Sequence, residues 1–286
     1  MGQLEERVEE RVRDWGVVVQ NTLKTQSSFI VFGKRGNQPV VLRVIRQPGE
    51  EWRCGAVMAA FDGRGMARVY EHTEGAVLLE RLSPGTPLAS IALNNRDEEA
   101  TEILADVIDR MSRSCESLDE PSREVLKAFA IAQDWGEGFH RYLASGDHQI
   151  PASLVEQGRR FYFDLCASQR NVRLLHGDLQ HYNVLFDSYR GWLAIDPKGV
   201  IGEVEYEIGA SLRNPYEKPE MFASPEAVER RLRRFETMLK LDSDRALAWG
   251  FAQAVLSAIW SFEDGFAVDA GNPSLLLANT IWPILK

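Results

Sequence analysis

The sequence predicts an α+β fold in which a small β-rich N-terminal lobe precedes a larger, mainly helical C-terminal lobe. Residues 17–82 contain short runs of Val, Ile, Leu and Phe bounded by Gly and Pro, a pattern typical of strands. Farther along the chain, apolar residues recur every three or four positions, as they do in amphipathic helices. Residues 83–87, which read SPGTP, carry the strongest linker signal. We therefore expect one lobe over residues 1–82 and the other over residues 83–286.

The N-terminal lobe is expected to begin with an amphipathic helix, because Leu4, Val8 and Val12 share one helical face. The runs SSFIVFG and PVVLRVI flank KRGNQ, which predicts a β-hairpin with a longer, Gly-containing loop. A short helix is expected over residues 52–61, ending at Asp62. Two further strands, MARVY and AVLLERL, each follow a glycine and complete the lobe.

The C-terminal lobe contains five segments with helical periodicity, interrupted by one predicted hairpin. The hairpin region reads VRLLH, then VLF, a turn over residues 187–191, and WLAID. The expected helices span Glu98–Cys115, Arg123–Leu143, Ser153–Cys166, Pro225–Leu239 and Asp244–Phe262.

Composition excludes several classes of protein. A formal net charge of −9 argues against a general nucleic-acid binder, which needs a basic surface, and is compatible with a cationic small-molecule substrate. Cys54, Cys115 and Cys166 form no C-x-x-C pair, so neither a zinc site nor a disulfide framework is predicted. The acidic N-terminus lacks an apolar stretch, and no later segment is apolar over a bilayer's width. We expect a cytoplasmic protein without membrane or nucleic-acid partners; the sequence indicates no oligomeric state.

The predicted hairpin region carries the residues that indicate chemistry. Residues 176–183 read HGDLQHYN and fit H-x-D-x-x-x-x-N, and Asp196 follows at the end of the next strand. A loop between strands can aim the carboxylate of Asp178 at an acceptor hydroxyl, while Asn183 and Asp196 can hold Mg²⁺ against nucleotide phosphates. An H-x-D triplet alone can be a coincidental turn, but the added Asn183 and Asp196 favour function. The pattern predicts an ATP-dependent phosphotransferase (kinase).

The segments LLHGDLQHYNVLF and WLAIDPKGVIGEVEYEIGASLRNP resemble the catalytic core of the aminoglycoside phosphotransferase family. The resemblance is greatest to the branch of aminoglycoside/hydroxyurea resistance kinases that includes streptomycin 6-kinases. It extends to GAVLLERLSPGTPL and to WSFEDG near the C-terminus, and so covers most of the chain. It implies a two-lobed protein-kinase-like fold with a nucleotide-binding N-lobe. It also implies ATP and Mg²⁺ as cofactors and an aminoglycoside such as streptomycin as acceptor.

The resemblance implies a role for each matching residue of the catalytic segment. Asp178 would be the catalytic base, and Asn183 and Asp196 would bind Mg²⁺ beside the nucleotide. The backbone from Glu80 to Leu82 would contact adenine.

Two further residues would support the catalytic loop, and a third lies within it. The resemblance places His176 behind the catalytic aspartate. Glu207 stands where the family usually has an aspartate that braces the loop, and its extra methylene would lengthen or shift that brace. His181 lies inside the loop and could touch a phosphate, but solvent exposure is the favoured interpretation.

The chain departs from the family pattern at two places in the nucleotide site. Arg43 replaces the family's lysine on the third strand, and a planar guanidinium is not equivalent to a compact ammonium. Arg43 either grips the phosphates bidentately or leaves a degenerate enzyme. Glu51 is the nearest candidate for its carboxylate partner, with surface exposure as the favoured alternative. In place of a glycine-rich loop, the turn at Ser28 would face the phosphates, or is an ordinary turn.

Other charged and aromatic residues have simpler interpretations. Glu263 and Asp264 at a helix end oppose the helix dipole, so a substrate ammonium or guanidinium group is one reason for their presence. The four arginines within residues 230–234 are interpreted as a solvated helix face rather than a nucleic-acid patch. Three tryptophans in helical patterns are expected in the core, namely Trp135, Trp249 and Trp260.

Three functional hypotheses therefore stand. The first is an aminoglycoside kinase, and the second is a kinase for a small metabolite such as a sugar, an amino sugar or an amino alcohol. The third is a nucleotide-binding pseudokinase, which rests on the replacement of lysine by Arg43.

Overall fold

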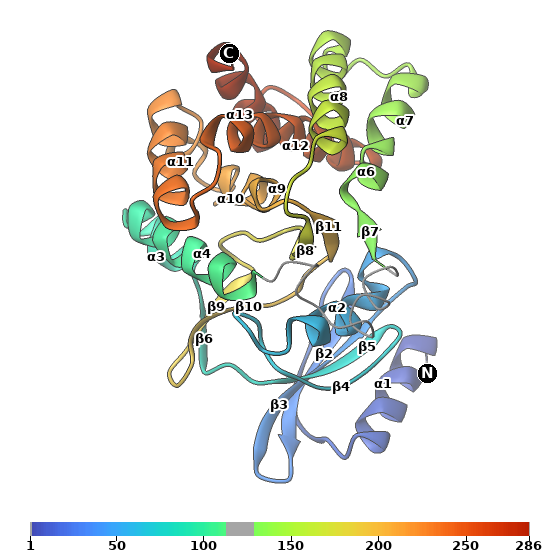
Figure 1. Cartoon of the computed structure of the whole chain (residues 1–286). Helices are drawn as coiled ribbons and strands as arrows, with labels where there is room; N and C mark the ends of the chain where they lie inside the picture. Colours follow the sequence, from blue (N-terminus) through green and yellow to red (C-terminus); the bar gives the residue numbers. More distant parts are fainter. Residues whose placement is uncertain (1, 113–128, 286) are drawn as a thin grey trace. The chain divides into compact units, whose positions relative to one another are not determined.

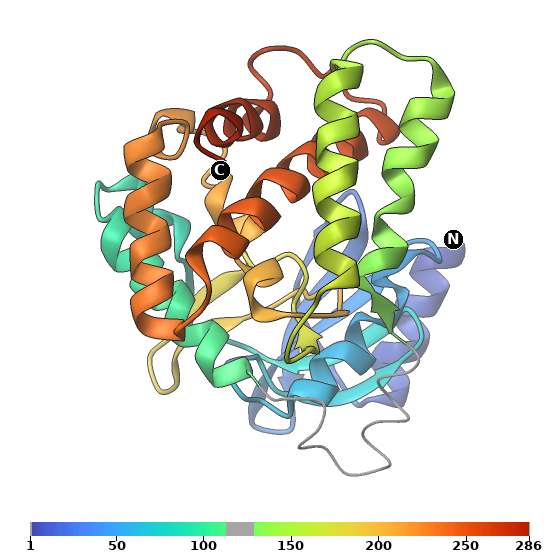
Figure 2. The same cartoon turned by 45° about the horizontal axis from the view of Figure 1, so that its top comes forward.

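The computed structural model describes residues 2–112 and 129–285, and the chain forms two compact units (Figures 1 and 2). The first unit combines residues 1–87 with residues 183–198, and the second combines residues 88–182 with residues 199–286. The predicted strands VLF and WLAID therefore belong to the same unit as the N-terminal segment. The division into lobes at residue 82 stays a prediction.

The first unit contains a five-stranded antiparallel sheet with the strand order β1-β2-β3-β5-β4 (Figure 1). Its strands are β1 (Val18–Lys24), β2 (Ser28–Arg35), β3 (Gln38–Ile45), β4 (Val69–Thr73) and β5 (Ala76–Glu80). Its helical segments are α1 (Gln3–Asp14), the 3₁₀ turn η1 (Glu50–Arg53) and α2 (Cys54–Phe61).

Alternation along β3 gives the two faces of this sheet different characters. Val40, Leu42 and Val44 are fully buried in one apolar cluster with Val8 of α1. Because successive side chains of a strand point to opposite faces, Arg43 lies on the other face. The strand thus holds an apolar core on one side and presents a cation on the other.

Most predicted elements of the N-terminal segment are confirmed, including the opening helix, the β2–β3 hairpin and the helix that ends at Asp62. The longer hairpin loop is wrong, because Arg35 pairs with Gln38 and only Gly36 and Asn37 form the turn. Gly36 has a φ of 58°, in the left-handed region that glycine enters without steric cost. Strand β1 was not predicted, because all seven of its residues are exposed and the alternation of a half-buried strand is missing.

The predicted linker is a strand. β6 (Pro84–Pro87) pairs with β9 (Val184–Asp187), which pairs in turn with β10 (Gly191–Ala194). The prediction of a linker was wrong because prolines were taken to exclude a strand. Proline is tolerated at the edge of a sheet, where its missing N–H removes no hydrogen bond to a neighbouring strand. The β9–β10 hairpin itself is confirmed.

A buried carboxylate, Asp187, ties the hairpin turn to the start of β6. It accepts hydrogen bonds from the backbone N–H groups of Ser83 at 2.9 Å, Tyr189 at 3.0 Å and Arg190 at 2.9 Å. Burial alone would raise the pKa of Asp187, but the three donors hold it below its ordinary value. The turn is therefore organised around an anion.

The second unit is mainly helical and contains a small sheet with the order β7-β11-β8. The strands are β7 (Ala130–Ile131), β8 (Arg173–Leu175) and β11 (Val200–Gly202). The helices are α3 (Ala89–Leu93), α4 (Asp97–Met111), α6 (Ala132–Trp135), α7 (Glu137–Ser145), α8 (Ala152–Ala167), α9 (Val204–Glu207), α10 (Gly209–Leu212), η3 (Pro219–Met221), α11 (Pro225–Leu239), α12 (Ser243–Glu263), α13 (Pro273–Ile281) and η4 (Trp282–Ile284).

The predicted helices α8, α11 and α12 are confirmed to within one residue at each end. The helix predicted over Glu98–Cys115 corresponds to α4, and Cys115 lies outside the described residues. The continuous helix over Arg123–Leu143 is wrong in its described part, because β7 and the break at Gly136 interrupt it. The strand VRLLH is β8, which pairs with β11 and not with the hairpin that follows it.

Helix α12 forms the centre of the second unit and runs between α8 and α11 (Figure 2). Its Trp249 is fully buried, with its ring 4.9 Å from that of Tyr206 and 5.2 Å from that of Tyr162. Trp135 and Trp260 contact each other edge-to-face at 5.8 Å. The core position predicted for Trp249 is confirmed, whereas Trp135 and Trp260 are half-buried and pack against each other. Among the described helices, none combines the length and apolarity that crossing a bilayer requires.

Candidate active site

The two predicted metal ligands lie at the same end of the β9–β10 hairpin. Val184 pairs with Ala194, and the N–H of Ile195 donates to the carbonyl of Asn183 at 2.9 Å. The backbone hydrogen bonding of the hairpin therefore continues one residue beyond the two strands. Asp196 follows directly, with a φ of 59°. This left-handed conformation is uncommon for residues other than glycine, and aspartate is among those that tolerate it. The hairpin register thus brings Asn183 and Asp196 to one end.

Arg43 joins this end of the hairpin through its guanidinium. It forms ion pairs with Asp196 and, at 2.6 Å, with Glu51, and it donates to Ser28 Oγ at 3.3 Å. Burial alone would lower the pKa of Arg43, but the charges of Asp196 and Glu51 raise it above its ordinary value. The arginine is therefore a permanent, half-buried cation held between two carboxylates.

Glu51 is the carboxylate partner of Arg43, the assignment that the sequence favoured less than simple surface exposure. Its side chain is 34% exposed. The residue precedes the body of α2, as the sequence indicates, but it lies in the 3₁₀ turn η1, which places it beside β3. A helical pattern that starts at residue 52 cannot reveal such a turn.

Ser28 is buried and closes its turn through Thr25. Its N–H donates to Thr25 Oγ1 at 2.9 Å, and the two hydroxyl oxygens are 3.0 Å apart. The same hydroxyl accepts from Arg43. A hydroxyl network therefore replaces a glycine-rich loop at this turn. The N–H and hydroxyl of Ser28, expected to face phosphates, hold the turn and the arginine here.

Cys54, the first residue of α2, is a buried free thiol near Arg43. Burial raises its pKa to about 11, although the charge of Arg43 opposes that shift. Cys166 is also free, and burial raises its pKa to about 12. Both thiols are neutral near pH 7 and unsuited to nucleophilic chemistry.

At the predicted adenine segment, the side chain of Glu80 has a structural role that was not predicted. Its carboxylate accepts from the N–H of Arg68 at 2.7 Å and contacts Arg190. Its own N–H donates to the carbonyl of Arg68 at 3.0 Å, and the next N–H, of Arg81, donates to Pro39 at 3.3 Å. The backbone that leads to Leu82 is therefore held in place within the first unit.

In the second unit, Glu207 braces the loop that carries Asp178. Its Oε2 accepts from the N–H of His176 at 2.6 Å, and its Oε1 accepts from the N–H of Gly177 at 3.0 Å. Gly177 has a φ of 81°, a conformation that only glycine adopts freely. His176 is fully buried, and its Nδ1 accepts from the N–H of Asp178 at 3.2 Å. Both residues thus hold the loop from behind.

The burial of Glu207 changes its acidity. Desolvation raises the pKa of Glu207 to about 7, partly offset by the backbone donors of His176 and Gly177 and reinforced by the nearby charge of Asp178. The glutamate side chain reaches two successive backbone N–H groups.

Arg213 is a site residue that the sequence interpretation did not identify. Its Nη2 lies 3.8 Å from Oδ1 of Asp178, and 11% of its side chain is exposed. Burial lowers the pKa of Arg213, and the charge of Asp178 opposes that shift. Its Nη1 is buried without a hydrogen-bond partner among the described residues. The only sequence signal was its place in LRNP, six residues after Glu207.

The favoured interpretation of His181 as solvent-exposed is wrong. The side chain is 1% exposed, and within the described part of the chain neither ring nitrogen has a hydrogen-bond partner. Burial, together with the charge of Arg231, lowers the pKa of His181 to about 3. The backbone of this residue is fixed because its carbonyl accepts from the N–H of Ala89 at 3.0 Å.

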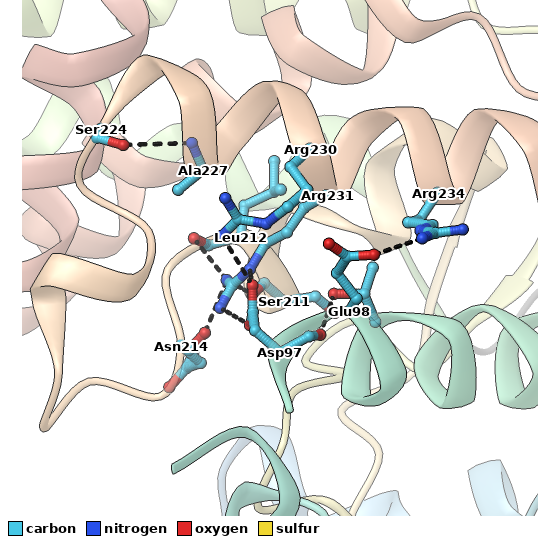
Figure 3. A network of polar contacts seen from close by, with 11 residues as sticks. Asp97, Glu98, Ser211, Leu212, Asn214, Ser224, Ala227, Arg230, Arg231 and Arg234 are labelled. Carbon is cyan, nitrogen blue, oxygen red and sulfur yellow. Dashed lines mark hydrogen bonds and ion pairs between the residues drawn. The ribbon is translucent and has the colours of Figure 1, made fainter. Parts of the chain in front are cut away.

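The interpretation of residues 230–234 as a solvated face is wrong for one arginine. Arg231 is 1% exposed and donates to Asp97 and to backbone carbonyls (Figure 3). Its neighbours Arg233 and Arg234 do lie at the surface, where they pair with glutamates.

The acidic pair expected to contact the acceptor lies at the end of α12. Glu263 forms a bidentate ion pair with Arg141 of α7, at 2.7 and 3.0 Å, whereas Asp264 is the exposed residue that follows the helix. Arg141 thus already compensates one of the two charges.

The donor set for a metal is sparse. Within residues 2–112 and 129–285, no cluster of three or more His, Cys, Asp or Glu side chains could hold a metal ion alone. One carboxylate and one amide oxygen, as Asp196 and Asn183 offer, fit Mg²⁺, which commonly completes its shell with water and substrate phosphates.

The chain is similar to known proteins over most of its length. Residues 15–265 match the family described as aminoglycoside/hydroxyurea antibiotic resistance kinase. The chain is 36% identical to a streptomycin 3''-kinase of Klebsiella pneumoniae, over 85% of this chain and 87% of the relative. It is 29% identical to a streptomycin 6-kinase of Streptomyces griseus, over 86% of this chain and 78% of the relative.

A solved structure shows the same fold. It is a thermostable mutant of aminoglycoside phosphotransferase APH(4)-Ia in a ternary complex with ADP and hygromycin B. The two chains superpose with a TM-score of 0.64 over 97% of each, at 17% identity. The predicted protein-kinase-like fold is confirmed.

The acidity of Glu207 predicts a specific dependence of stability on pH. Because its folded pKa of about 7 lies above its ordinary value, its contribution to stability is full below pH 4.5 and is lost as the pH rises through about 7. We expect the free energy of unfolding of the wild type, relative to Glu207→Gln, to fall by about 2 kcal/mol between pH 5 and pH 8. Urea unfolding at several pH values measures it.

Glu205→Gln, on the same helix, controls for the loss of one carboxylate. A difference between wild type and Glu207→Gln that stays constant over this pH range would contradict the assignment.

Proposed function

The chain belongs to the aminoglycoside/hydroxyurea antibiotic resistance kinase family, and on that basis we propose that it transfers the γ-phosphate of ATP to a hydroxyl group of an aminoglycoside. Streptomycin is the first acceptor to test, because two relatives are named as streptomycin kinases. The observation that carries the proposal is the braced loop, in which Glu207 and His176 fix the backbone that presents Asp178. Since ATP is the donor, we expect the reaction in the cytoplasm.

Asp178 has the properties that a catalytic base requires. Its carboxylate is 30% exposed while the loop behind it is buried, so a hydroxyl group can approach an oxygen whose backbone is fixed. In the proposed reaction, the carboxylate of Asp178 accepts the proton of the acceptor hydroxyl. The oxygen of that hydroxyl bonds to the γ-phosphorus of ATP, the bond from this phosphorus to the β-phosphate oxygen breaks, and ADP leaves. Arg213 stabilises the negative charge of Asp178 before transfer.

On the nucleotide side, we propose that Asn183 and Asp196 hold Mg²⁺ and that Arg43 takes the place of the family's lysine. Bound Mg²⁺ supplies neutralisation of phosphate charge. Arg43 uses its two terminal nitrogens for two different carboxylates, and so orients Asp196 as well as contributing positive charge. Ser28 and the backbone of residues 80–82 complete the proposed nucleotide contacts.

The rival hypotheses carry less support. The pseudokinase hypothesis depends on Arg43 alone, yet this arginine has the carboxylate partner that an active site of this kind needs. A small-metabolite kinase keeps the same chemistry and differs only in its acceptor. On the acceptor side, Asp264 is a better candidate than Glu263 for a cationic group, because Arg141 already neutralises Glu263.

The proposed base can be tested with Asp178→Ala. We expect kcat for phosphorylation of streptomycin by Mg²⁺–ATP to fall about 100- to 10,000-fold, because general-base assistance and positioning are lost together. Mass spectrometry of the product, which gains one phosphate group, measures the rate. Asp106→Asn removes an exposed carboxylate on α4 and serves as the matched control.

Undiminished transfer by Asp178→Ala would contradict the assignment of the base. Transfer by the wild type to a sugar or amino alcohol, but to no aminoglycoside, would favour the metabolite kinase.

The role of Arg43 can be tested with Arg43→Lys. One ammonium cannot reproduce contacts with both Asp196 and Glu51, so we expect weaker Mg²⁺–ATP binding by calorimetry and a kcat about tenfold lower. A higher rate in the variant would instead mean that arginine is a degenerate replacement.

A further inference from the structure

A buried arginine in α11 binds the end of the short helix α10. Nη1 of Arg231 donates to the backbone carbonyls of Ser211 at 3.0 Å, Leu212 at 3.4 Å and Asn214 at 2.8 Å (Figure 3). The last carbonyls of a helix have no partner within it, and a cation there also complements the helix dipole. A four-residue helix has little stability of its own, so this contact fixes the segment from outside.

Asp97 determines the direction in which Arg231 points. It is the first residue of α4 and accepts from Nη2 of Arg231 at 2.7 Å and from Nε at 3.2 Å. Burial alone would raise the pKa of Asp97, but Arg231 and Arg230 hold it below its ordinary value, so the pair is ionised near pH 7. The bidentate contact leaves Nη1 aimed at the carbonyls.

Segment 211–214 touches the loop of Asp178 at two points. Ser211 Oγ donates to the carbonyl of Leu179 at 2.8 Å, and Arg213 lies beside the carboxylate of Asp178. Arg231 binds the carbonyls on either side of Arg213. Arg231 therefore binds the segment that contacts the loop of Asp178 at two points.

The cost of burying this charge argues that it has a specific use. Removing an ion pair from water carries a free-energy cost that the attraction between the charges need not repay, and apolar residues of similar volume often stabilise a protein equally well. Arg233, on the same helix, instead forms an exposed ion pair with Glu229 one helical turn away, and this pair avoids the cost of burying a charge.

We propose that Arg231, oriented by Asp97, is a positioning residue for phosphoryl transfer, which holds segment 211–214 so that Ser211 and Arg213 fix Asp178. The proposal rests on the proposed function for its kinetic consequence. It does not depend on the acceptor, because the contacts lie within the second unit and involve no ligand.

The first test is hydrogen–deuterium exchange of Arg231→Met without substrates, with Arg233→Met as the matched control on the same helix. We expect faster exchange in peptides covering residues 176–183 and 209–214, and wild-type exchange throughout Arg233→Met. Unchanged exchange in residues 176–183, or a uniform increase over the whole chain, would overturn the proposal, because Arg231 would then be a general stabilising residue.

The second test is kinetic. For Arg231→Met we expect kcat to fall about 10- to 100-fold while KM for ATP changes less than about threefold, since only the base is displaced. A loss confined to KM, or explained by the unfolded fraction in thermal melting, would overturn the proposal.

Ser211→Ala keeps the buried charges and tests the same link if Arg231→Met folds poorly. It removes the hydrogen bond to Leu179, so we expect faster exchange in residues 176–183 and a kcat reduced about three- to tenfold. Wild-type exchange in Ser211→Ala would overturn the link. If the wild type phosphorylates no acceptor, the proposed function fails, while the exchange measurements still decide the positioning role.

Discussion

The loop that carries Asp178 depends on one buried interaction, the carboxylate of Glu207 accepting two successive backbone N–H groups. A carboxylate without solvent is costly unless its oxygens are hydrogen-bonded, and here each oxygen has a backbone donor, from His176 or Gly177. The same contacts fix the backbone directly before Asp178. Because a base must be held within a fraction of an ångström to be effective, a rigid backbone at this position is a requirement of the proposed chemistry.

Arginine serves two comparable purposes in the two units. In the first unit Arg43 holds Asp196 and Glu51, and in the second Arg231 holds Asp97 and three carbonyls. Arg231 is buried and Arg43 is half-buried. Both contact several acceptors at once through a planar fork of N–H donors, a fixed geometry that the compact ammonium of lysine does not have. The replacement that first suggested a degenerate enzyme is therefore consistent with a site organised around a bidentate cation.

The sequence was sufficient for features with local signals. The loop around Asp178 is contained in eight residues, and α8, α11 and α12 have regular apolar repeats. The sequence was insufficient where the burial of a side chain depends on a partner far away along the chain. From the sequence, Arg231 was interpreted as a surface residue. In the structure it is buried, because Asp97, 134 positions earlier in the chain, pairs with it. Glu51 and His181 were misjudged for the same reason, since exposure depends on contacts that composition does not encode.

The central claim, that Glu207 holds the loop of Asp178 from behind, can be tested directly by NMR. The amide resonances of His176 and Gly177 should shift together with pH, with one midpoint of about 7, because both N–H groups donate to the same carboxylate. The shift should vanish in Glu207→Gln. Separate midpoints for the two amides, or a pH-dependent shift that persists in Glu207→Gln, would contradict the account.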